Sequence, residues 1–397
     1  MRLSDNCQPV LRILSALVLS LWFAHGQAIP IMAYGGVKAD QCTKERLLEF
    51  RHAGFDVSIT NFSDASTADF LEVLNLARQC HVQFFALSTE LWADPVKTIH
   101  AIKHHPALFG YYIFDEPLPQ QMEDMRKRYT LMRTADSSRP FYLNLIPYYD
   151  DGLLHRFGID HYEEYVRQAS SLGVPQLCFD YYPITDSGIR PKWYLNLETI
   201  RREALRTNRP FWGFALSTPH ADYPQPTLAM LRLQMYTNLA YGAKALLYFT
   251  YWTPPRDQNF VFHDGPIGLD GHRTKTYDIV REMNLELRPM LPLFDKAQVT
   301  HVAHMGKNIP EGANHLTRTP TNIKRIKTYG QQGALISLLT TKEHEYMAVV
   351  NKDYQKELKI HIEATKTVVQ IDKHLQDKAI RSDYTITGGD MLLFRLK

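Results

Sequence analysis

The chain has 397 residues, enough for one large domain and a small one, and its 45 lysine and arginine residues nearly balance its 42 aspartate and glutamate residues, for a net charge of +3. No long basic run is present, so composition argues against a nucleic-acid partner. The four cysteines, Cys7, Cys42, Cys80 and Cys178, are too widely spaced for a disulfide framework or a metal site, and no cofactor is expected.

The N-terminus has the pattern of a signal peptide. Leu11 and Arg12 precede an apolar run at residues 13–24, and a short segment with small residues follows at residues 25–28. This order predicts a signal peptide over residues 1–28, and hence a periplasmic or secreted protein. The apolar run is too short for a comfortable membrane span, so no stable span is expected after cleavage. An uncleaved anchor is the alternative.

Strand-like and helix-like segments then alternate along the chain. The predicted strands cover residues 31–35, 55–61, 82–88, 110–117, 141–146, 176–182, 211–216 and 245–251. The predicted helices that follow them cover residues 43–53, 65–80, 94–104, 119–134, 162–172, 195–206, 227–241 and 276–287. This alternation predicts an α/β fold, a closed (β/α)8 TIM barrel over residues 29–295. An open doubly wound sheet is the competitor, but the Gly-x-Gly-x-x-Gly turn that it usually shows after its first strand is absent.

The pattern of the sequence changes after the barrel. Short strand-like runs with turn residues between them cover residues 333–339, 346–350, 358–362, 367–371 and 391–395, and no helical period is visible among them. This pattern predicts a small C-terminal antiparallel β-sandwich over residues 296–397. Its expected role is to stabilise the barrel, with glycan binding as the alternative.

The stretch from Gly110 to Pro117 is the centre of the functional hypothesis. It is an apolar, aromatic run that ends at two adjacent carboxylates, Asp115 and Glu116, followed by a proline that cannot continue a strand. Two charges at the edge of a core are costly unless something uses or pairs them. In a parallel barrel, that edge is where catalytic groups are found.

The predicted strand ends share a composition of carboxylates, amides and aromatic rings. They supply Tyr34, Asn61, Ser88, Asp115, Glu116, Asn144, Asp180, Tyr182, Trp212, Tyr251 and Trp252. No histidine cluster or Cys–His pair lies among them, so neither metal nor thiol chemistry is expected. Carboxylates beside aromatic platforms suit hydrolysis of glycosidic bonds, with an oligosaccharide or polysaccharide as substrate. Asp115, Glu116 and Asp180 are the catalytic candidates, and the sugar-binding candidates are Tyr34, Asn144, Tyr182, Trp212, Tyr251 and Trp252.

Glu116 is the candidate general acid. Such an acid must hold its proton near neutral pH, so its pKa must be raised. The neighbouring Asp115 carboxylate and the apolar strand end both push the pKa of Glu116 upward. The alternative is a structural glutamate paired with an arginine at the rim.

The sequence at residues 111–117, Tyr-Tyr-Ile-Phe-Asp-Glu-Pro, resembles the fourth-strand motif of (β/α)8 glycoside hydrolases, in which the glutamate is the acid. Residues 177–184, 210–214 and 241–249 resemble matching segments of β-galactosidase-like proteins of gut Bacteroidetes. The resemblance implies a glycoside hydrolase barrel with Glu116 as the general acid.

One departure from the family pattern leaves the mechanism open. The predicted seventh strand ends without the nucleophilic glutamate that retaining members of the large clan carry there. In one replacement, Asp180 is the second carboxylate, and a separation from Glu116 of roughly 5–5.5 Å means retention whereas roughly 6.5–9.5 Å means inversion. In the other, Asp115 and Glu116 act as a pair similar to that of β-N-acetylhexosaminidases, where the aspartate orients the acetamide of the substrate; Tyr182 then braces that acetamide.

Two other functions remain open at this level. The absent glutamate fits a non-catalytic glycan-binding barrel of a polysaccharide-uptake system. A structural envelope protein would instead place the strand-end carboxylates in ion pairs, with no pocket above them.

Overall fold

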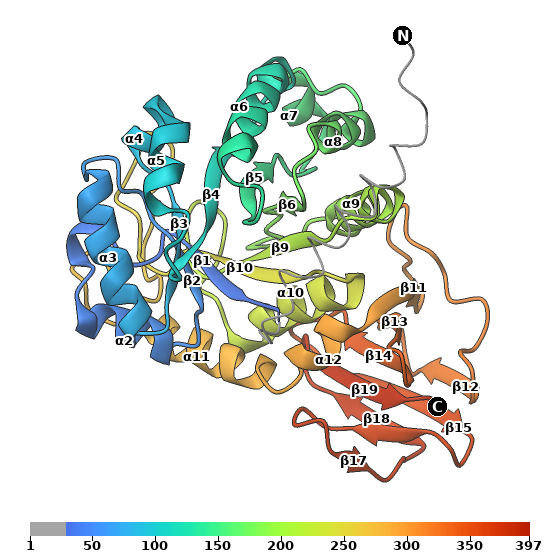
Figure 1. Ribbon diagram of the computed structural model, residues 1–397. Helices are drawn as coiled ribbons and strands as arrows, with labels where there is room; N and C mark the ends of the chain where they lie inside the picture. The colour runs from blue at the N-terminus through green and yellow to red at the C-terminus, as the bar shows by residue number, and fades with distance from the viewer. Residues whose placement is uncertain (1–28) are drawn as a thin grey trace.

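The computed structural model describes residues 29–397, so the predicted signal peptide lies outside the described residues. Eight parallel strands form a closed barrel in the order β1-β10-β9-β6-β5-β4-β3-β2 (Figure 1). Their bounds are β1 (Ile31–Tyr34), β2 (Val57–Ile59), β3 (Gln83–Ala86), β4 (Leu108–Asp115), β5 (Phe141–Leu145), β6 (Leu177–Phe179), β9 (Phe211–Leu216) and β10 (Ala245–Phe249). The predicted (β/α)8 barrel is therefore confirmed.

Helices connect these strands and form the outer layer of the barrel (Figure 1). The long ones are α2 (Lys44–His52), α3 (Thr67–Gln79), α5 (Pro95–Ile102), α6 (Met122–Ala135), α8 (Tyr162–Ser171), α9 (Trp193–Thr207), α10 (Leu228–Tyr241) and α11 (Lys275–Leu287). The short ones are α4 (Thr89–Ala93), α7 (Asp151–Arg156) and α12 (Leu291–Lys296). None of the helices between residues 29 and 397 combines the length and the apolar character that a membrane span requires.

Local sequence signals explain where many of these helices begin and end. Ser66 caps α3 in a capping box with Asp69, and the side chain of Thr227 caps α10. The chain leaves α10 at Gly242, whose φ of 101° lies in the left-handed region that glycine adopts without strain. These caps fix the lengths of the helices and so the positions of the loops that follow each strand.

The C-terminal region is built from two antiparallel sheets, as predicted for the β-sandwich. The six-stranded sheet has the order β11-β13-β14-β19-β16-β17, and the three-stranded sheet has the order β12-β15-β18. The bounds are β11 (Gln298–Met305), β12 (Ile323–Thr328), β13 (Ala334–Thr340), β14 (Glu345–Asn351), β15 (Leu358–Ala364), β16 (Val369–Ile371), β17 (Asp377–Lys378), β18 (Asp383–Ile386) and β19 (Met391–Arg395). A cluster of buried residues that includes Ile336, Ile360 and Phe394 forms their common core.

The sequence missed β11, β12, β17 and β18 because none of them has a strong apolar run. In β12, Ile323 is buried, whereas Lys324 and Arg325 are exposed. The charged residues on the solvent face interrupt the apolar run, so a prediction based on apolar runs does not detect this strand.

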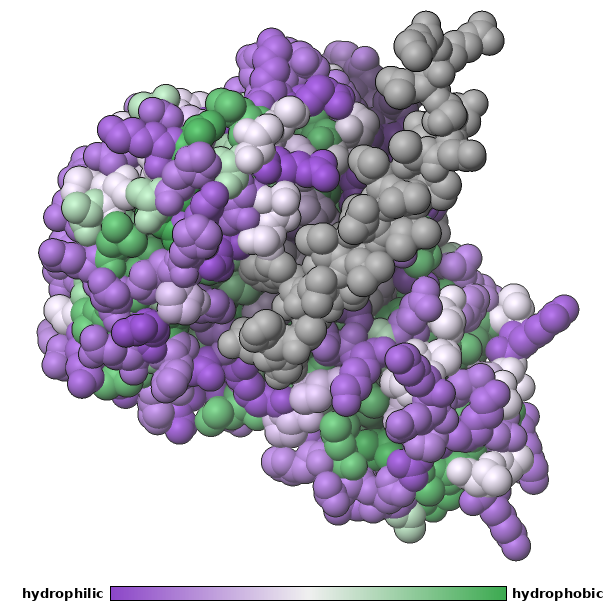
Figure 2. Space-filling view, in the orientation of Figure 1, coloured by the Kyte–Doolittle hydropathy of each residue, from purple (hydrophilic) through white to green (hydrophobic). Residues whose placement is uncertain are grey.

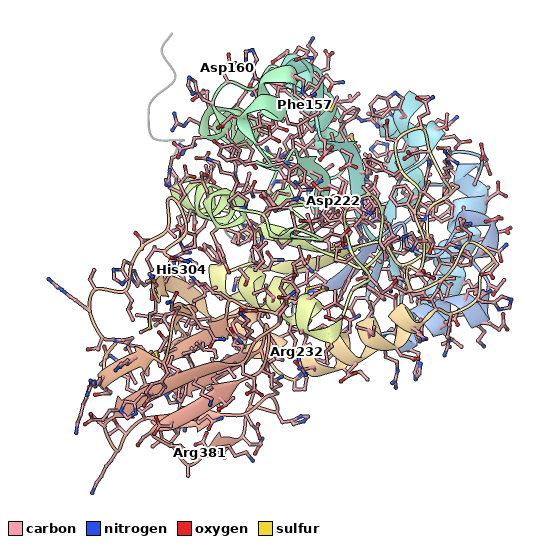
Figure 3. All side chains as sticks on the ribbon, turned by 180° about the vertical axis from the view of Figure 1, so that it is seen from behind. Phe157, Asp160, Asp222, Arg232, His304 and Arg381 are labelled. Atoms are coloured by element: carbon pink, nitrogen blue, oxygen red, sulfur yellow. The ribbon has the colours of Figure 1, made fainter. Side chains whose placement is uncertain are left out.

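Helix α10 joins the barrel to the C-terminal strands, because it packs against both β13 and β14. The Ser337 hydroxyl donates to the Ala240 carbonyl at 2.7 Å across this contact. Arg232 and His304 lie along the seam between the two parts (Figure 3). The surface seen in Figure 2 is mostly hydrophilic, with apolar residues scattered over it.

Candidate active site

An irregularity in β4 turns Asp115 toward the barrel interior. Tyr112 pairs with Tyr142 of β5, but Asp115 already pairs with Asn144, so β4 has one more residue than β5 over this stretch. Without the extra residue, Asp115 would fall on the opposite face from Tyr112. With it, both side chains share the inner face. Bulges of this kind often re-aim a side chain beside an active site.

Glu116 follows with a backbone conformation that is unusual for its residue type. Its φ is 50°, in the left-handed region, and its N–H donates to the Asn144 carbonyl at 3.0 Å. A non-glycine residue held there costs roughly 1–2 kcal/mol. Such local strain concentrates at functional sites, where the surrounding structure maintains it.

The three predicted carboxylates meet at the carboxyl ends of β4 and β6. Asp115 accepts hydrogen bonds from the hydroxyls of Tyr34 at 3.1 Å and Tyr142 at 3.5 Å. Asp180 directly follows β6, and its carboxyl group is close enough to that of Glu116 for each to affect the pKa of the other. The structure thus brings Asp115, Glu116 and Asp180 into one cluster.

Asp180 is held by two further donors. The Asn144 amide donates to one of its oxygens at 2.8 Å, and the Tyr182 hydroxyl donates to the other at 3.2 Å. The Tyr149 hydroxyl donates to the Asp180 carbonyl at 3.3 Å. The Asp180 carboxyl group therefore has a fixed orientation.

Burial raises the pKa values of all three carboxyl groups, and repulsion by neighbouring carboxylates adds to the rise at Glu116 and Asp180. Desolvation, followed by the charge of Asp115, raises the pKa of Glu116 to about 7, and the hydrogen bond with Asp180 offsets part of this rise. Desolvation is also the main cause that raises the pKa of Asp115 and, well above its ordinary value, that of Asp180. Interacting carboxyl groups share their protons, so these pKa values belong to the cluster.

The cluster is nevertheless open to solvent. Glu116 is exposed, and Asp115 and Asp180 are only partly buried. Desolvation by the surrounding protein is still the largest cause of the pKa rise at each of them. A solute can therefore approach Glu116.

Three of the six predicted sugar-binding residues lie at this cluster and three do not. Tyr34, Asn144 and Tyr182 each hydrogen-bond a carboxylate, as described above. Trp212 lies inside the barrel core, with its ring 6.2 Å from that of Phe85 and 6.5 Å from that of Phe109. The structure therefore does not place Trp212 as a floor for a sugar, because its strand position directs it into barrel packing.

Tyr251 and Trp252 pack on the outer side of the barrel wall. The Tyr251 ring lies 4.9 Å from that of Phe50 in α2, in an edge-to-face contact. Trp252 is buried, with the cations of Lys38 and Arg46 at 5.2 Å and 5.4 Å from its ring centre. Both residues follow β10, but neither contacts the carboxylate cluster, so the prediction that they line it is not supported by their placement.

Several aromatic residues near the cluster were not selected from the sequence. Tyr112 and Tyr142 stack at 5.1 Å below the carboxylates. Tyr149 and Tyr223 hydrogen-bond to each other, and the Arg190 guanidinium lies 4.9 Å and 5.3 Å from their ring centres. Strict alternation from Asn144 could have found Tyr142. Tyr149, Arg190 and Tyr223 lie in loops, where no periodic signal exists.

Asp222 fixes this part of the rim. Its carboxylate pairs with Arg190 at 3.3 Å, and it lies in the loop between β9 and α10 (Figure 3). Across residues 29–397, no group of three or more His, Cys, Asp or Glu side chains is arranged to hold a metal ion.

No protein-family model and no curated protein matches the sequence. Among solved structures, β-galactosidase from Bacillus circulans sp. alkalophilus matches with a TM-score of 0.62 and 10% identity, over 92% of this chain and 99% of that one. The catalytic mutant of Gan42B, a GH42 β-galactosidase from G. stearothermophilus, matches with a TM-score of 0.58 and 7% identity, over 94% and 98% of the two chains. Amy13B from Eubacterium rectale matches with a TM-score of 0.56 and 8% identity, over 95% and 98%. The chain thus shares the fold of these proteins over more than nine-tenths of its length.

Proposed function

We propose that this protein is a glycoside hydrolase in which Glu116 is the general acid and Asp180 is the second carboxylate. The observation that carries the proposal is the cluster of Asp115, Glu116 and Asp180 at the carboxyl end of the barrel, in which Glu116 is exposed and has a pKa raised to about 7. Barrel enzymes place their catalytic groups at this end. The fold shared with two β-galactosidases supports the same reaction class.

We place the proton of the pair on Glu116, although burial and the charges of Glu116 and Asp115 raise the pKa of Asp180 well above its ordinary value. Both Asp180 oxygens already accept hydrogen bonds, from Asn144 and Tyr182, which favours an ionised Asp180. Glu116 reaches solvent and carries the proton of the pair. This division gives an acid and a carboxylate side by side, which is what cleavage of a glycosidic bond needs.

The contact between the two groups favours retention of configuration. The side-chain interaction with Asp180 that lowers the pKa of Glu116 acts at short range, whereas an inverting enzyme keeps roughly 6.5–9.5 Å open for a water molecule. An entering sugar has to part Glu116 from Asp180, and the smaller displacement reaches the retaining separation of roughly 5–5.5 Å. Asp180 then acts as the nucleophile.

The reaction divides into two balanced steps. Glu116 gives its proton to the glycosidic oxygen, the bond from that oxygen to the anomeric carbon breaks, and an Asp180 oxygen bonds to that carbon. Glu116, now ionised, takes a proton from a water molecule whose oxygen attacks the same carbon and releases Asp180. Asp115, held by the Tyr34 and Tyr142 hydroxyls, keeps the pKa of Glu116 high throughout.

Substrate assistance is the second mechanism that the site allows. Asp115 is adjacent to Glu116 and fixed by hydroxyl donors, so it could orient the acetamide of a 2-acetamido sugar, with Tyr182 beside it. In that case only 2-acetamido substrates would react. Asp180→Asn would then retain much of the activity, whereas a nucleophilic Asp180 predicts its loss.

A non-catalytic glycan-binding barrel is the alternative function. The residues after β9 are Ser217 and Thr218, both buried, so this strand end offers no carboxylate. Saturable glycan binding without turnover would favour this alternative.

Export to the periplasm or beyond is part of the proposed function, supported by the apolar run at residues 13–24.

A panel of aryl glycosides, followed by NMR of the released anomer, tests the proposal. We expect one sugar to be hydrolysed with retention, and Glu116→Gln to lower kcat on natural glycosides by about a thousandfold. Glu164→Gln, in an exposed ion pair with Arg167 on α8, is the matched control and should keep most of the activity. Hydrolysis of natural glycosides that persists unchanged in Glu116→Gln would overturn the assignment.

A further inference from the structure

Trp92 is the one exposed tryptophan in the part of the chain that the structure describes. It is 51% exposed, whereas Trp193, Trp212 and Trp252 are 2%, 5% and 4% exposed. An isolated exposed apolar side chain is ordinary on a protein surface. Trp92 differs because its surroundings hold it in place.

Helix α4, which carries Trp92, is fastened to its neighbours along its length. The Ser88 hydroxyl caps the helix by accepting from the Leu91 N–H at 3.1 Å. The Thr89 hydroxyl donates to the Ser63 carbonyl at 2.9 Å, and the Thr67 N–H donates to the Glu90 carboxylate at 3.0 Å. A helix of 5 residues is unstable alone, so these contacts determine its position.

Arg128 of α6 also holds Trp92 in place. Its guanidinium lies 3.9 Å from the centre of the Trp92 ring, and it donates to the carbonyls of Trp92 and Leu91, each at 3.2 Å. Within residues 29–397 it has no ion pair with a carboxylate, and burial alone lowers the pKa of Arg128 to about 10. A half-buried cation without an anionic partner is costly, and here its contacts serve to hold one indole ring.

The indole ring lies at the same end of the barrel as the carboxylate cluster. Helix α4 lies in the segment that follows β3, beside α5, and such segments stand at the catalytic end of a barrel (Figure 1). The Trp92 ring is 6.1 Å from that of Phe114, which directly precedes Asp115 in β4. Trp92 is therefore a rigid, flat, apolar surface on the rim, beyond the strand that carries the carboxylates.

We propose that Trp92 is an outlying subsite that stacks on a sugar ring of a glycan whose scissile bond lies at Glu116. One face of a pyranose ring presents C–H groups, which match a flat indole, and its hydroxyls remain in water. A platform held in advance by Arg128 loses little entropy when the sugar binds. The inference rests on the proposed function, because it makes the substrate an oligosaccharide or longer chain rather than a disaccharide.

Fluorescence quenching of the exposed indole tests the subsite directly. The full chain carries Glu116→Gln to prevent turnover and Trp22→Phe to remove the tryptophan outside the described residues. Acrylamide is the quencher, and the probes are disaccharides and hexasaccharides of galactose, xylose and N-acetylglucosamine. We expect a hexasaccharide to reduce quenching about twofold by covering the ring, and the matching disaccharide to leave it unchanged.

Variants then separate the subsite from the chemistry. In the parent background, Trp92→Ala should raise KM for the hexasaccharide about tenfold and leave kcat and aryl monosaccharide hydrolysis unchanged. Trp92→Phe should restore most of the affinity, and Tyr329→Ala, an exposed aromatic of the C-terminal sheet, is the matched control.

The two failures are distinguishable. If the parent hydrolyses the hexasaccharide, but no glycan protects Trp92 and Trp92→Ala keeps the parental KM, the subsite is wrong and the hydrolase stands. If a hexasaccharide protects Trp92 but no glycan is cleaved, the hydrolase is wrong and the subsite stands as a binding surface.

Discussion

The Glu116 carboxyl group lies beside that of Asp180 and each affects the pKa of the other, although the two residues follow strands β4 and β6, which are separated by β5. Asn144 of β5 bridges the gap, because its carbonyl accepts from the Glu116 N–H and its amide donates to Asp180. One asparagine thus ties the backbone of the acid to the carboxylate of its partner. The contact makes the state of one carboxyl group dependent on the other.

The pH dependence of catalysis should follow this coupling. Glu116 must be protonated, and its pKa is raised to about 7, so kcat/KM should fall as pH rises through neutrality. Asp115→Asn removes the negative charge that contributes to this rise, and the alkaline limb should therefore move to lower pH. The measurement is the pH profile of kcat/KM for both proteins. An alkaline limb that stays in place would mean that another group sets it.

The same carboxyl group should make stability depend on pH. The pKa of Glu116 rises from 4.5 to about 7 on folding, so the folded chain keeps a proton that the unfolded chain releases. Stability is therefore lost as pH rises through this window. Glu116→Gln cannot ionise, so it should match the parent at pH values below the window and exceed it above, as measured by urea unfolding. A constant difference between the two proteins would contradict the linkage.

The left-handed backbone at Glu116 leads to a separate prediction about stability. Both Glu116→Gly and Glu116→Ala remove the carboxyl group, but only glycine relieves the strain at a φ of 50°. The glycine variant should be more stable than the alanine variant by about 1 kcal/mol, after the entropy that glycine gains in the unfolded chain is subtracted. Both should be inactive. Equal unfolding free energies would show that the position carries no backbone strain.

The sequence predicted the eight strand–helix units, and it predicted that three carboxylates stand at strand ends. Both predictions depend on local signals. Apolar periodicity fixes the strands, and Asp115, Glu116 and Asp180 stand directly at or after their ends. The inward direction of Asp115 depends on the extra residue in β4, which appears only in the pairing with β5.

Three of the predicted aromatic residues do not lie at the carboxylate cluster, because the direction of a side chain cannot be predicted from its position near a strand end. Trp212, Tyr251 and Trp252 are close in sequence to strand ends, but Trp212 turns into the barrel core and the other two pack outside the wall. Tyr149 and Arg190 reach the rim through loops whose paths are set by tertiary contacts. Sequence position identifies a strand end, whereas the face of a side chain depends on register.

The seam between the barrel and the C-terminal sheets should depend on Glu286. This carboxylate of α11 pairs with Arg232 of α10 at 2.5 Å and with Lys373 of the C-terminal region at 2.7 Å, and it also accepts from the Tyr236 hydroxyl at 2.5 Å. Its side chain is only 12% exposed, and these donors hold its pKa below the ordinary value even though burial acts to raise it. Glu286→Gln leaves two cations facing a neutral amide, and should reduce the unfolding free energy by about 3 kcal/mol.

The matched control for this prediction is the surface pair of Asp124 and Lys127, whose side chains are 75% and 70% exposed. Asp124→Asn should cost less than about 0.5 kcal/mol, because water screens exposed pairs. A double-mutant cycle of Glu286→Gln with Lys373→Met, followed by urea unfolding, isolates the part of the effect that crosses the seam. Because Lys373 also pairs with Asp390 at 2.8 Å, the two changes should be non-additive without cancelling fully. Additive free energies in that cycle would show that Glu286 stabilises the barrel alone and contributes nothing to the attachment of the C-terminal sheets.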